Sequence, residues 1–154
     1  LFSKIENSTD GRIINVASGA HKRYRLDIKD LENKINYSGW KSYCRSKLLN
    51  ILFTYEFNRR FKYRIKCNCL HPGFINSNFG NNNSSFYRVP VNIIKNLFAR
   101  STKFASKNVV YLSTSTNLNK TGEYFYNCKS VKSSEESYNL ELAKKVWELT
   151  LKYF

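Results

Sequence analysis

The chain has 154 residues, 42% of them hydrophobic and 24% charged, which suits one compact domain, and 26 lysines and arginines against 11 acidic residues give a net charge of +15. The basic residues are scattered along the sequence and match no recognition motif, so we expect no nucleic-acid partner. No stretch is apolar over the roughly 18 residues that a membrane-spanning helix needs, and four cysteines are too few for a disulfide framework, which predicts free thiols.

The chain begins at Leu1 and contains no methionine, so we expect it to be a piece of a longer protein. Apolar runs and turn residues predict, in chain order, the end of a helix before Gly11, a strand at 12–17, a loop at 21–36 with one helical turn, a helix at 39–61, a strand at 63–70, a loop at 76–85, helices at 91–98 and 102–113, a strand at 123–126 and a helix at 136–153. Strands that alternate with helices imply right-handed crossovers and a parallel sheet. The expected fold class is therefore α/β, with about three strands and flanking helices.

The carboxyl ends of the first two predicted strands carry residues of interest. The first strand, 12–17, is apolar with little alternation, which is typical of a strand covered on both faces, and Ser18 ends it. The second strand stops at Pro72 and Gly73, because proline removes a ladder donor and glycine frees the backbone to turn. Ligands of open parallel sheets bind at this edge, so we expect Ser18 and the Pro-Gly turn to border one crevice.

Tyr43 and Lys47 lie four residues apart near the start of the long predicted helix, which makes their side chains neighbours on one face. A phenol is a poor base at neutral pH, but a fixed cation beside it favours the phenolate and brings it toward the useful acid–base range. The spacing alone is a weak signal, because tyrosine and lysine are both abundant here. Its position near the same sheet edge as Ser18 strengthens the prediction of an acid–base site.

Three segments fall into one known pattern: Gly11-Arg-Ile-Ile-Asn-Val-Ala-Ser18, Tyr43-Cys-Arg-Ser-Lys47, and Asn68-Cys-Leu-His71-Pro72-Gly73 followed by Ser77. Together they resemble the carboxyl-terminal half of a short-chain dehydrogenase/reductase. The runs Gly19-Ala-His21-Lys, Tyr37-Ser-Gly-Trp40, Lys47-Leu-Leu-Asn-Ile-Leu-Phe-Thr54, Leu70-His-Pro-Gly73 and Gly122-Glu-Tyr-Phe-Tyr-Asn-Cys128 resemble its retinol dehydrogenase branch. The resemblance covers nearly the entire chain and implies a partial Rossmann-type, doubly wound parallel sheet, with residues 1–154 forming the C-terminal part of a single domain.

The resemblance implies an oxidoreductase that interconverts an alcohol and a carbonyl compound with NADP, or alternatively NAD, and for which a lipophilic substrate fits the branch. It assigns proton transfer to Tyr43, and to Lys47 both the lowering of the phenol pKa and a hydrogen bond to the nicotinamide ribose. Ser18 would hold the substrate oxygen as charge develops on it. The residues implied to line the nicotinamide amide are Pro72, Gly73 and Ser77.

Two positions depart mildly from the family pattern, which usually has serine in place of Ala17 and threonine in place of Ser77. A larger departure is that the glycine-rich phosphate turn, the residue that selects NAD or NADP and the structural asparagine belong to an N-terminal half that we expect to be absent. We therefore expect this chain by itself to bind cofactor poorly, to be inactive as an enzyme, and to expose the edge of its first strand.

Alternatives remain open at this point. The chain fits a catalytically inactive, truncated remnant that keeps the pattern, or a basic module that uses its charge on nucleic acid or lipid headgroups. The segment 86–100 occupies the place of the family's variable substrate lid and suits either a lipophilic substrate, contact with a membrane surface, or ordinary packing. The family also leaves a homodimer open, and the expected location is the cytoplasm or the cytosolic face of the endoplasmic reticulum.

Other candidate residues have simpler explanations. Cys67, Cys69 and His71 share one strand face and imitate half of a metal site, but no second ligand pair with zinc spacing exists, so packing is expected. His21 is expected to be an exposed loop residue. The aromatic residues of the last helix, Trp147, Tyr153 and Phe154, are expected to pack that helix on the sheet.

Overall fold

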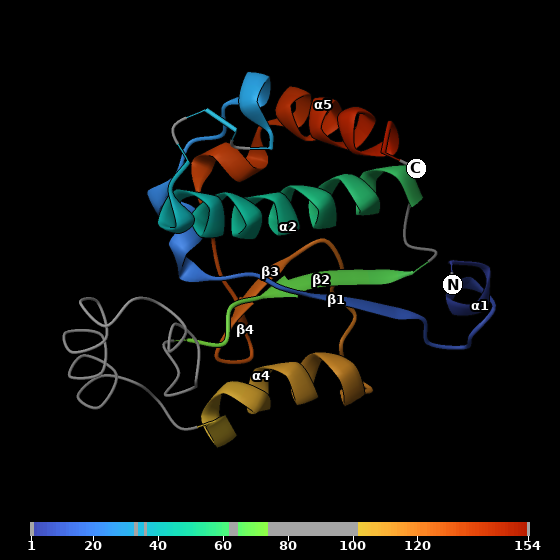
Figure 1. Ribbon diagram of the computed structural model, residues 1–154. Helices are drawn as coiled ribbons and strands as arrows, with labels where there is room; N and C mark the ends of the chain where they lie inside the picture. Colours follow the sequence, from blue (N-terminus) through green and yellow to red (C-terminus); the bar gives the residue numbers. More distant parts are fainter. Residues whose placement is uncertain (1, 33, 36, 62–64, 74–101, 154) are drawn as a thin grey trace.

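The computed structural model describes residues 2–32, 34–35, 37–61, 65–73 and 102–153, and it places a small sheet between layers of helices (Figure 1). The strands are β1 (Arg12–Val16), β2 (Lys66–Leu70), β3 (Tyr124–Tyr126) and β4 (Lys129–Ser130), in the order β1-β2-β3-β4. The first three are parallel, with Arg12 opposite Lys66 and Cys69 opposite Tyr124, whereas β4 runs antiparallel to β3. The predicted α/β fold with a parallel sheet is confirmed.

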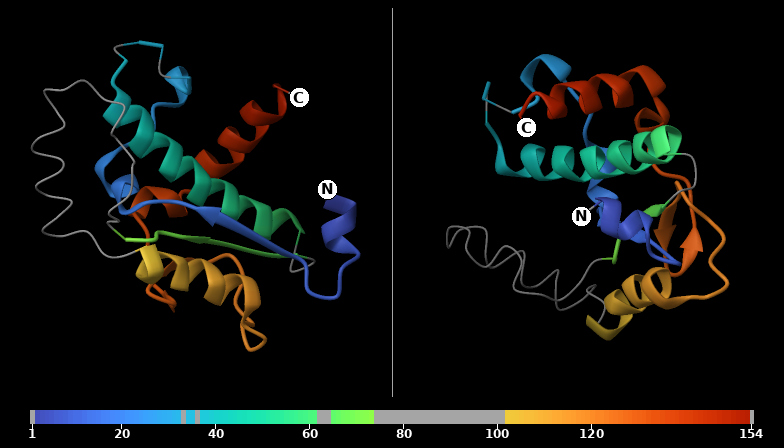
Figure 2. Two further views of the ribbon diagram at one scale, coloured as in Figure 1. Left: turned by 60° about the horizontal axis from the view of Figure 1, so that its bottom comes forward. Right: turned by 90° about the vertical axis from the view of Figure 1, so that its right-hand side faces the viewer.

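Helices cover both faces of the sheet, as a doubly wound arrangement requires (Figure 2). Helix α2 (Gly39–Phe61) lies over one face and α4 (Thr102–Thr114) over the other. Helix α5 (Leu140–Leu151) lies on the outer side of α2, away from the sheet. The short helix α1 (Phe2–Glu6) precedes β1, and the 3-10 helices η1 (Gly19–Arg23), η2 (Ile28–Asp30) and η3 (Glu135–Tyr138) lie in the connections.

The core is built from the apolar stripe of α2 and the inner side chains of the strands. Ile51 of α2 packs with Ala17, Cys69 and Tyr124 between the helix and the sheet. On the other face Leu112 of α4 packs with the sheet in a second cluster, whose other buried members are Leu70, Leu118 and Phe125. Each fully buried large apolar side chain contributes on the order of 1.5–3 kcal/mol, so these two clusters fix the sheet between α2 and α4.

Several boundaries differ from the predictions. The last helix begins at Leu140 instead of residue 136, because Asn139 leaves the helical conformation (φ −70°, ψ 107°) and its side chain accepts the backbone N–H of Leu142 as an N-cap. Strand β4 was not predicted; it forms because Asn127 and Cys128 adopt positive φ angles of 50° and 59°, which turn the chain into a tight hairpin. The elements expected at 76–85 and 91–98, and the lid segment 86–100, lie outside the described residues.

The prediction that the last helix packs on the sheet is wrong. The Trp147 ring of α5 stacks on Phe53 of α2, with centroids 5.4 Å apart and planes at 15°. The Tyr153 hydroxyl donates to Glu32, and its side chain is largely exposed, while Phe154 lies outside the described residues. The presence of this helix was predicted, but sequence does not tell which layer an apolar side chain faces, and here α2 presents a second apolar side to α5.

Strand β1 is less covered than its apolar sequence suggested. Val16 is 44% exposed, and none of the five strand residues is buried. Within the described part of the chain β1 pairs with β2 alone, so it is an edge strand. An edge strand has a neighbouring strand on one side only, which explains the exposure of the β1 side chains. The unpaired edge of β1 agrees with the expectation that the first strand exposes its edge.

In the part of the chain that the structure describes, no helix is both long enough and apolar enough to cross a lipid bilayer.

Candidate functional site

The carboxyl end of β1 is the place where the predicted acid–base residues gather. Ser18 follows this strand by two residues, and its Oγ accepts the backbone N–H of Ala20 at 3.2 Å, which starts η1. From α2, Lys47 Nζ donates to the carbonyl oxygen of Val16 at 3.2 Å, the last residue of β1. The ammonium of α2 is therefore fixed at the strand end that leads into Ser18.

Tyr43 lies one turn before Lys47 on the same helix. Lys47 Nζ is 5.6 Å from the centroid of the Tyr43 ring, within the range of a cation–π contact. A second neighbour of the phenol is Trp40, whose ring stacks on Tyr43 with centroids 5.9 Å apart and planes at 28°. The half-buried Tyr43 ring therefore contacts both an indole and an ammonium, and the contact with Lys47 agrees with the predicted i, i+4 pairing.

The Pro72-Gly73 turn lies at the carboxyl end of β2, next to the Ser18 segment. Gly73 has a φ angle of +90°, and its backbone N–H donates to Nδ1 of His71 at 3.0 Å. The His71 ring reaches back toward β1, since a Cβ placed on Gly19 would lie 3.7 Å from His71 Cε1. The structure therefore brings the turn and the residue after Ser18 together through the His71 ring. Ser77 lies outside the described residues.

A buried asparagine of α4 fixes this turn from the other face of the sheet. Asn108 is 3% exposed; its Nδ2 donates to the carbonyl oxygen of His71 at 3.2 Å, and its Oδ1 accepts the N–H of Cys128 at 2.7 Å. One amide thus joins α4, the end of β2 and the β3–β4 hairpin. Sequence reasoning missed this residue, because its two partners are 37 and 20 positions away.

The chain is similar over almost its whole length to known dehydrogenases. Retinol dehydrogenase 13 of Homo sapiens is 31% identical over 154 residues, which are 96% of this chain and 46% of the relative. Retinol dehydrogenase 14 of Mus musculus is 28% identical over 158 residues, 97% of this chain and 46% of the relative. The chain is thus similar in sequence to retinol dehydrogenases. The resemblance predicted from the motifs is confirmed, and the chain spans about half the length of the curated relatives it matches.

A solved structure has a region with the same fold as this chain. The crystal structure of an uncharacterized protein from Mycobacterium paratuberculosis superimposes with a TM-score of 0.68 at 23% identity, over 92% of this chain and 49% of that one. No family model matches the chain. The superposition supports the partial Rossmann-type arrangement of the sheet and its two helix layers.

His21 is placed differently from the expectation. It was expected to be exposed, but its side chain is fully buried, with a relative exposure of 0%. Nδ1 lies 2.6 Å from the carbonyl oxygen of Ser18, and Nε2 accepts the backbone N–H of Ser134 at 3.0 Å. The prediction failed because the partner Ser134 is 113 residues away, and no local pattern indicates such a contact.

The cysteines act as packing residues, as predicted. Cys67 and Cys69 are fully buried, and burial raises the pKa of both thiols to about 12. All four cysteines are free thiols. Among the residues that the structure describes, no group of three or more histidine, cysteine or acidic side chains is placed to hold a metal ion.

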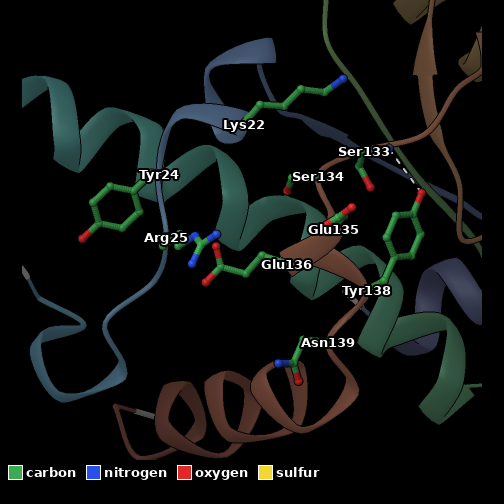
Figure 3. Close-up of a pocket in the computed structure, with 9 residues that line it drawn as sticks. All are labelled: Lys22, Tyr24, Arg25, Ser133, Ser134, Glu135, Glu136, Tyr138 and Asn139. Atoms are coloured by element: carbon green, nitrogen blue, oxygen red, sulfur yellow. Dashed lines mark hydrogen bonds between the residues drawn. The ribbon is translucent and has the colours of Figure 1, made fainter.

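Two surface hollows lie beside η3, and Tyr138 lines both of them. The larger has a volume of about 860 Å³ and is drawn in Figure 3; its lining residues are Lys22, Tyr24, Arg25, Ser133, Ser134, Glu135, Glu136, Tyr138 and Asn139. The smaller, of about 390 Å³, lies between η3 and α2. The described lining of both hollows leaves out Ser18, Tyr43 and Lys47, so these hollows are separate from the candidate site.

Proposed function

We propose that this chain carries the proton-transfer half of an NAD(P)-dependent oxidoreductase that interconverts an alcohol and a carbonyl compound. The observation that carries the proposal is the bond from Lys47 to Val16, which fixes the cation one helical turn from Tyr43 and at the strand end that leads to Ser18. A phenol, an ammonium and a hydroxyl at the carboxyl edge of a parallel sheet make a suitable acid–base set for this chemistry.

In the reducing direction, the Tyr43 hydroxyl gives its proton to the carbonyl oxygen of the substrate. The positive charge of Lys47 favours the phenolate that remains, and so lowers the cost of the transfer. The Ser18 Oγ uses a lone pair to accept the N–H of Ala20, which leaves its own hydrogen able to donate to the substrate oxygen. In the oxidising direction the same groups take the proton back from the alcohol.

The residues present fit a nicotinamide cofactor, which when bound supplies or accepts the hydride. Lys47 has three N–H donors, and the bond to Val16 occupies one of them, so the ammonium retains donors for ribose hydroxyls. The Pro72-Gly73 turn, which has no Cβ at Gly73, allows a planar ring to approach the backbone. We propose NADP as the cofactor, with NAD as the alternative, and Ser77 as a further contact.

The exposed Trp40 ring beside Tyr43 favours an apolar substrate. Trp40 is 61% exposed and Tyr37 is 74% exposed, and Trp40 stacks directly on the Tyr43 ring. Large exposed aromatic rings next to a reacting group bind extended apolar ligands well. We therefore propose a lipophilic alcohol or aldehyde, and the names of the relatives make retinol and retinal the first compounds to test.

The charge of the chain suggests where in the cell the protein encounters such a substrate. A net charge of +15 attracts the protein to the anionic headgroups of a membrane, and lipophilic alcohols dissolve in the hydrocarbon layer beneath those headgroups. We propose that the protein acts in the cytoplasm or at the cytosolic face of the endoplasmic reticulum, where it takes its substrate from the membrane surface. The homodimer stays a prediction from the family.

The test uses the protein made from its complete reading frame, because the chain spans about half of its relatives. With NADPH and all-trans-retinal, we expect turnover in the wild type. We expect a loss of about 10²–10⁴-fold in Tyr43→Phe, which keeps the ring but not the exchangeable proton. NADPH binding, followed by fluorescence, should be retained in the variant. A wild type without turnover, or a Tyr43→Phe variant with normal turnover, overturns the proposal, and the first result favours the inactive remnant.

A further inference from the structure

Two histidines outside the catalytic set hold the backbone on both sides of the candidate site. The His21 ring lies against Ser18, where Nδ1 is 2.6 Å from the Ser18 carbonyl oxygen and Nε2 is 3.0 Å from the N–H of Ser134. A carbonyl oxygen only accepts, so Nδ1 must carry a hydrogen, and an N–H only donates, so Nε2 must be bare. These two partners require the neutral Nδ1–H tautomer of His21.

The second histidine has the opposite requirement. Nδ1 of His71 accepts the backbone N–H of Gly73 at 3.0 Å, so Nδ1 must be bare and the neutral ring carries its hydrogen on Nε2. The ring is held flat against Tyr126, with centroids 4.4 Å apart and planes at 7°. His71 thereby closes the Pro72-Gly73 turn in the conformation with φ of +90°.

The two rings share one environment. Tyr124 lies between them, with its ring centroid 5.1 Å from that of His21 and 6.2 Å from that of His71. Burial lowers the pKa of His21, against the opposing effect of the Ser18 carbonyl, and burial lowers the pKa of His71 to about 4. The charge of a protonated His21 lowers the pKa of His71 further, and the charge of Lys22 lowers both. The titratable groups facing the pair are thus Lys22 on η1 and Tyr124 and Tyr126 on β3, and both rings stay neutral at neutral pH.

We propose that His21 and His71 are positioning residues of the candidate site: as neutral rings of opposite tautomer, they fix the backbone of Ser18 and of the Gly73 turn relative to Tyr43 and Lys47. This inference rests on the proposed function. Neither ring touches the reacting atoms. Protonation of either ring removes the acceptor for a backbone N–H, and so releases the segment that it holds.

The tautomers can be measured without any assay of activity. In protein labelled with ¹⁵N-histidine, long-range ¹H–¹⁵N spectra at pH 7.5 should show His21 protonated on Nδ1 and His71 protonated on Nε2. The Gly73 and Ser134 amide resonances should move together with the protonation of His71 and His21 respectively. A His21 ring with its hydrogen on Nε2, or a His71 ring with its hydrogen on Nδ1, overturns the proposed arrangement.

Matched variants test the positioning role. In His71→Asn the side-chain oxygen takes the place of Nδ1 and can still accept from Gly73, whereas His71→Leu cannot. We expect His71→Leu to weaken NADPH binding about tenfold, the equivalent of one net hydrogen bond, and His71→Asn to restore it. In the same way His21→Leu should lower kcat about tenfold with little change in the KM for NADPH, and His21→Asn, whose amide can donate to Ser18, should recover most of kcat.

The outcomes separate this inference from the function on which it rests. A wild-type protein without turnover defeats the proposed function, while the tautomer spectra still report whether the rings hold the two turns. Turnover in the wild type with unchanged kcat and NADPH affinity in both leucine variants defeats the positioning role alone. A leucine variant that lowers only the melting temperature, with kcat and KM unaltered, also defeats it, because it shows a purely structural role.

Discussion

Lys47 and Asn50 donate to the same acceptor, the carbonyl oxygen of Val16, from distances of 3.2 Å and 3.1 Å. The two residues are three apart on α2, so both side chains reach the end of β1 from one helix face. The shared carbonyl explains how a long, flexible lysine is kept at one place. It also supplies a natural control, because the two donors make the same bond but differ in charge.

We predict that Lys47→Met and Asn50→Ala lower the free energy of unfolding by a similar amount, about 1 kcal/mol, because each removes one donor to Val16. Their effects on turnover should differ. Loss of the cation in Lys47→Met should lower kcat by about 100-fold or more, since the phenolate of Tyr43 loses its charge partner. Urea denaturation and steady-state kinetics measure the two effects, and equal loss of turnover in both variants contradicts the assigned role of Lys47.

Gly73 and Gly19 offer a second matched pair, since both lie beside the His71 ring. A Cβ on either glycine would meet neighbours only at ordinary contact distances, 3.7 Å or more, but Gly73 alone of the two has a positive φ, +90°. We therefore predict that Gly73→Ala lowers the free energy of unfolding by about 1–2 kcal/mol through backbone strain. Gly19→Ala should change it much less. Thermal unfolding of the two variants gives the comparison, and an equal effect would show that the turn relaxes.

The sequence was sufficient to predict the helices and strands that have both a hydrophobic periodicity and clear end signals. Helix α2 has the predicted bounds, because its apolar stripe is long and Gly39 opens it. Strand β2 ends where Pro72 was expected to stop it. The proximity of the Tyr43 and Lys47 side chains was also predictable, because four-residue spacing on a helix is a local property.

Features that depend on residues distant in the sequence could not be predicted. The burial of His21 follows from its contact with Ser134, and the docking of α5 follows from the stacking of Trp147 on Phe53. Neither partner can be chosen from a single sequence. Asn50 is the exception among the missed residues, since its position three residues after Lys47 on the same face was a usable signal.

Thiol chemistry should divide the cysteines by burial. Burial raises the pKa of Cys67 and Cys69 to about 12 and also raises the pKa of Cys44, so the reactive thiolate is scarce at all three. Cys128, in the β3–β4 hairpin, is only half-buried. We predict that a maleimide at pH 7.5 labels Cys128 first and the other three only after unfolding, as mass spectrometry of the labelled peptides will show. Rapid labelling of Cys67 in the folded protein contradicts the packing of β2 against α2.

The stability of the protein should depend on pH through His71. Burial lowers its pKa from 6.5 to about 4 in the folded state, so between these values the unfolded chain binds more protons than the folded one. The contribution of His71 to the free energy of unfolding should therefore be constant above about pH 7, fall as the pH drops from 6.5 to 4, and change no further below that.

The loss attributable to His71 should be on the order of 1–2 kcal/mol, because the ring is only partly buried and solvent screens its charge. Urea denaturation between pH 4 and pH 8 measures it. The control is His71→Asn, which cannot titrate yet keeps an acceptor for Gly73, and its profile should be flatter over the same interval. An equally steep profile in the variant assigns the pH dependence to other groups, of which the buried His21 is the first to examine, because burial also lowers its pKa.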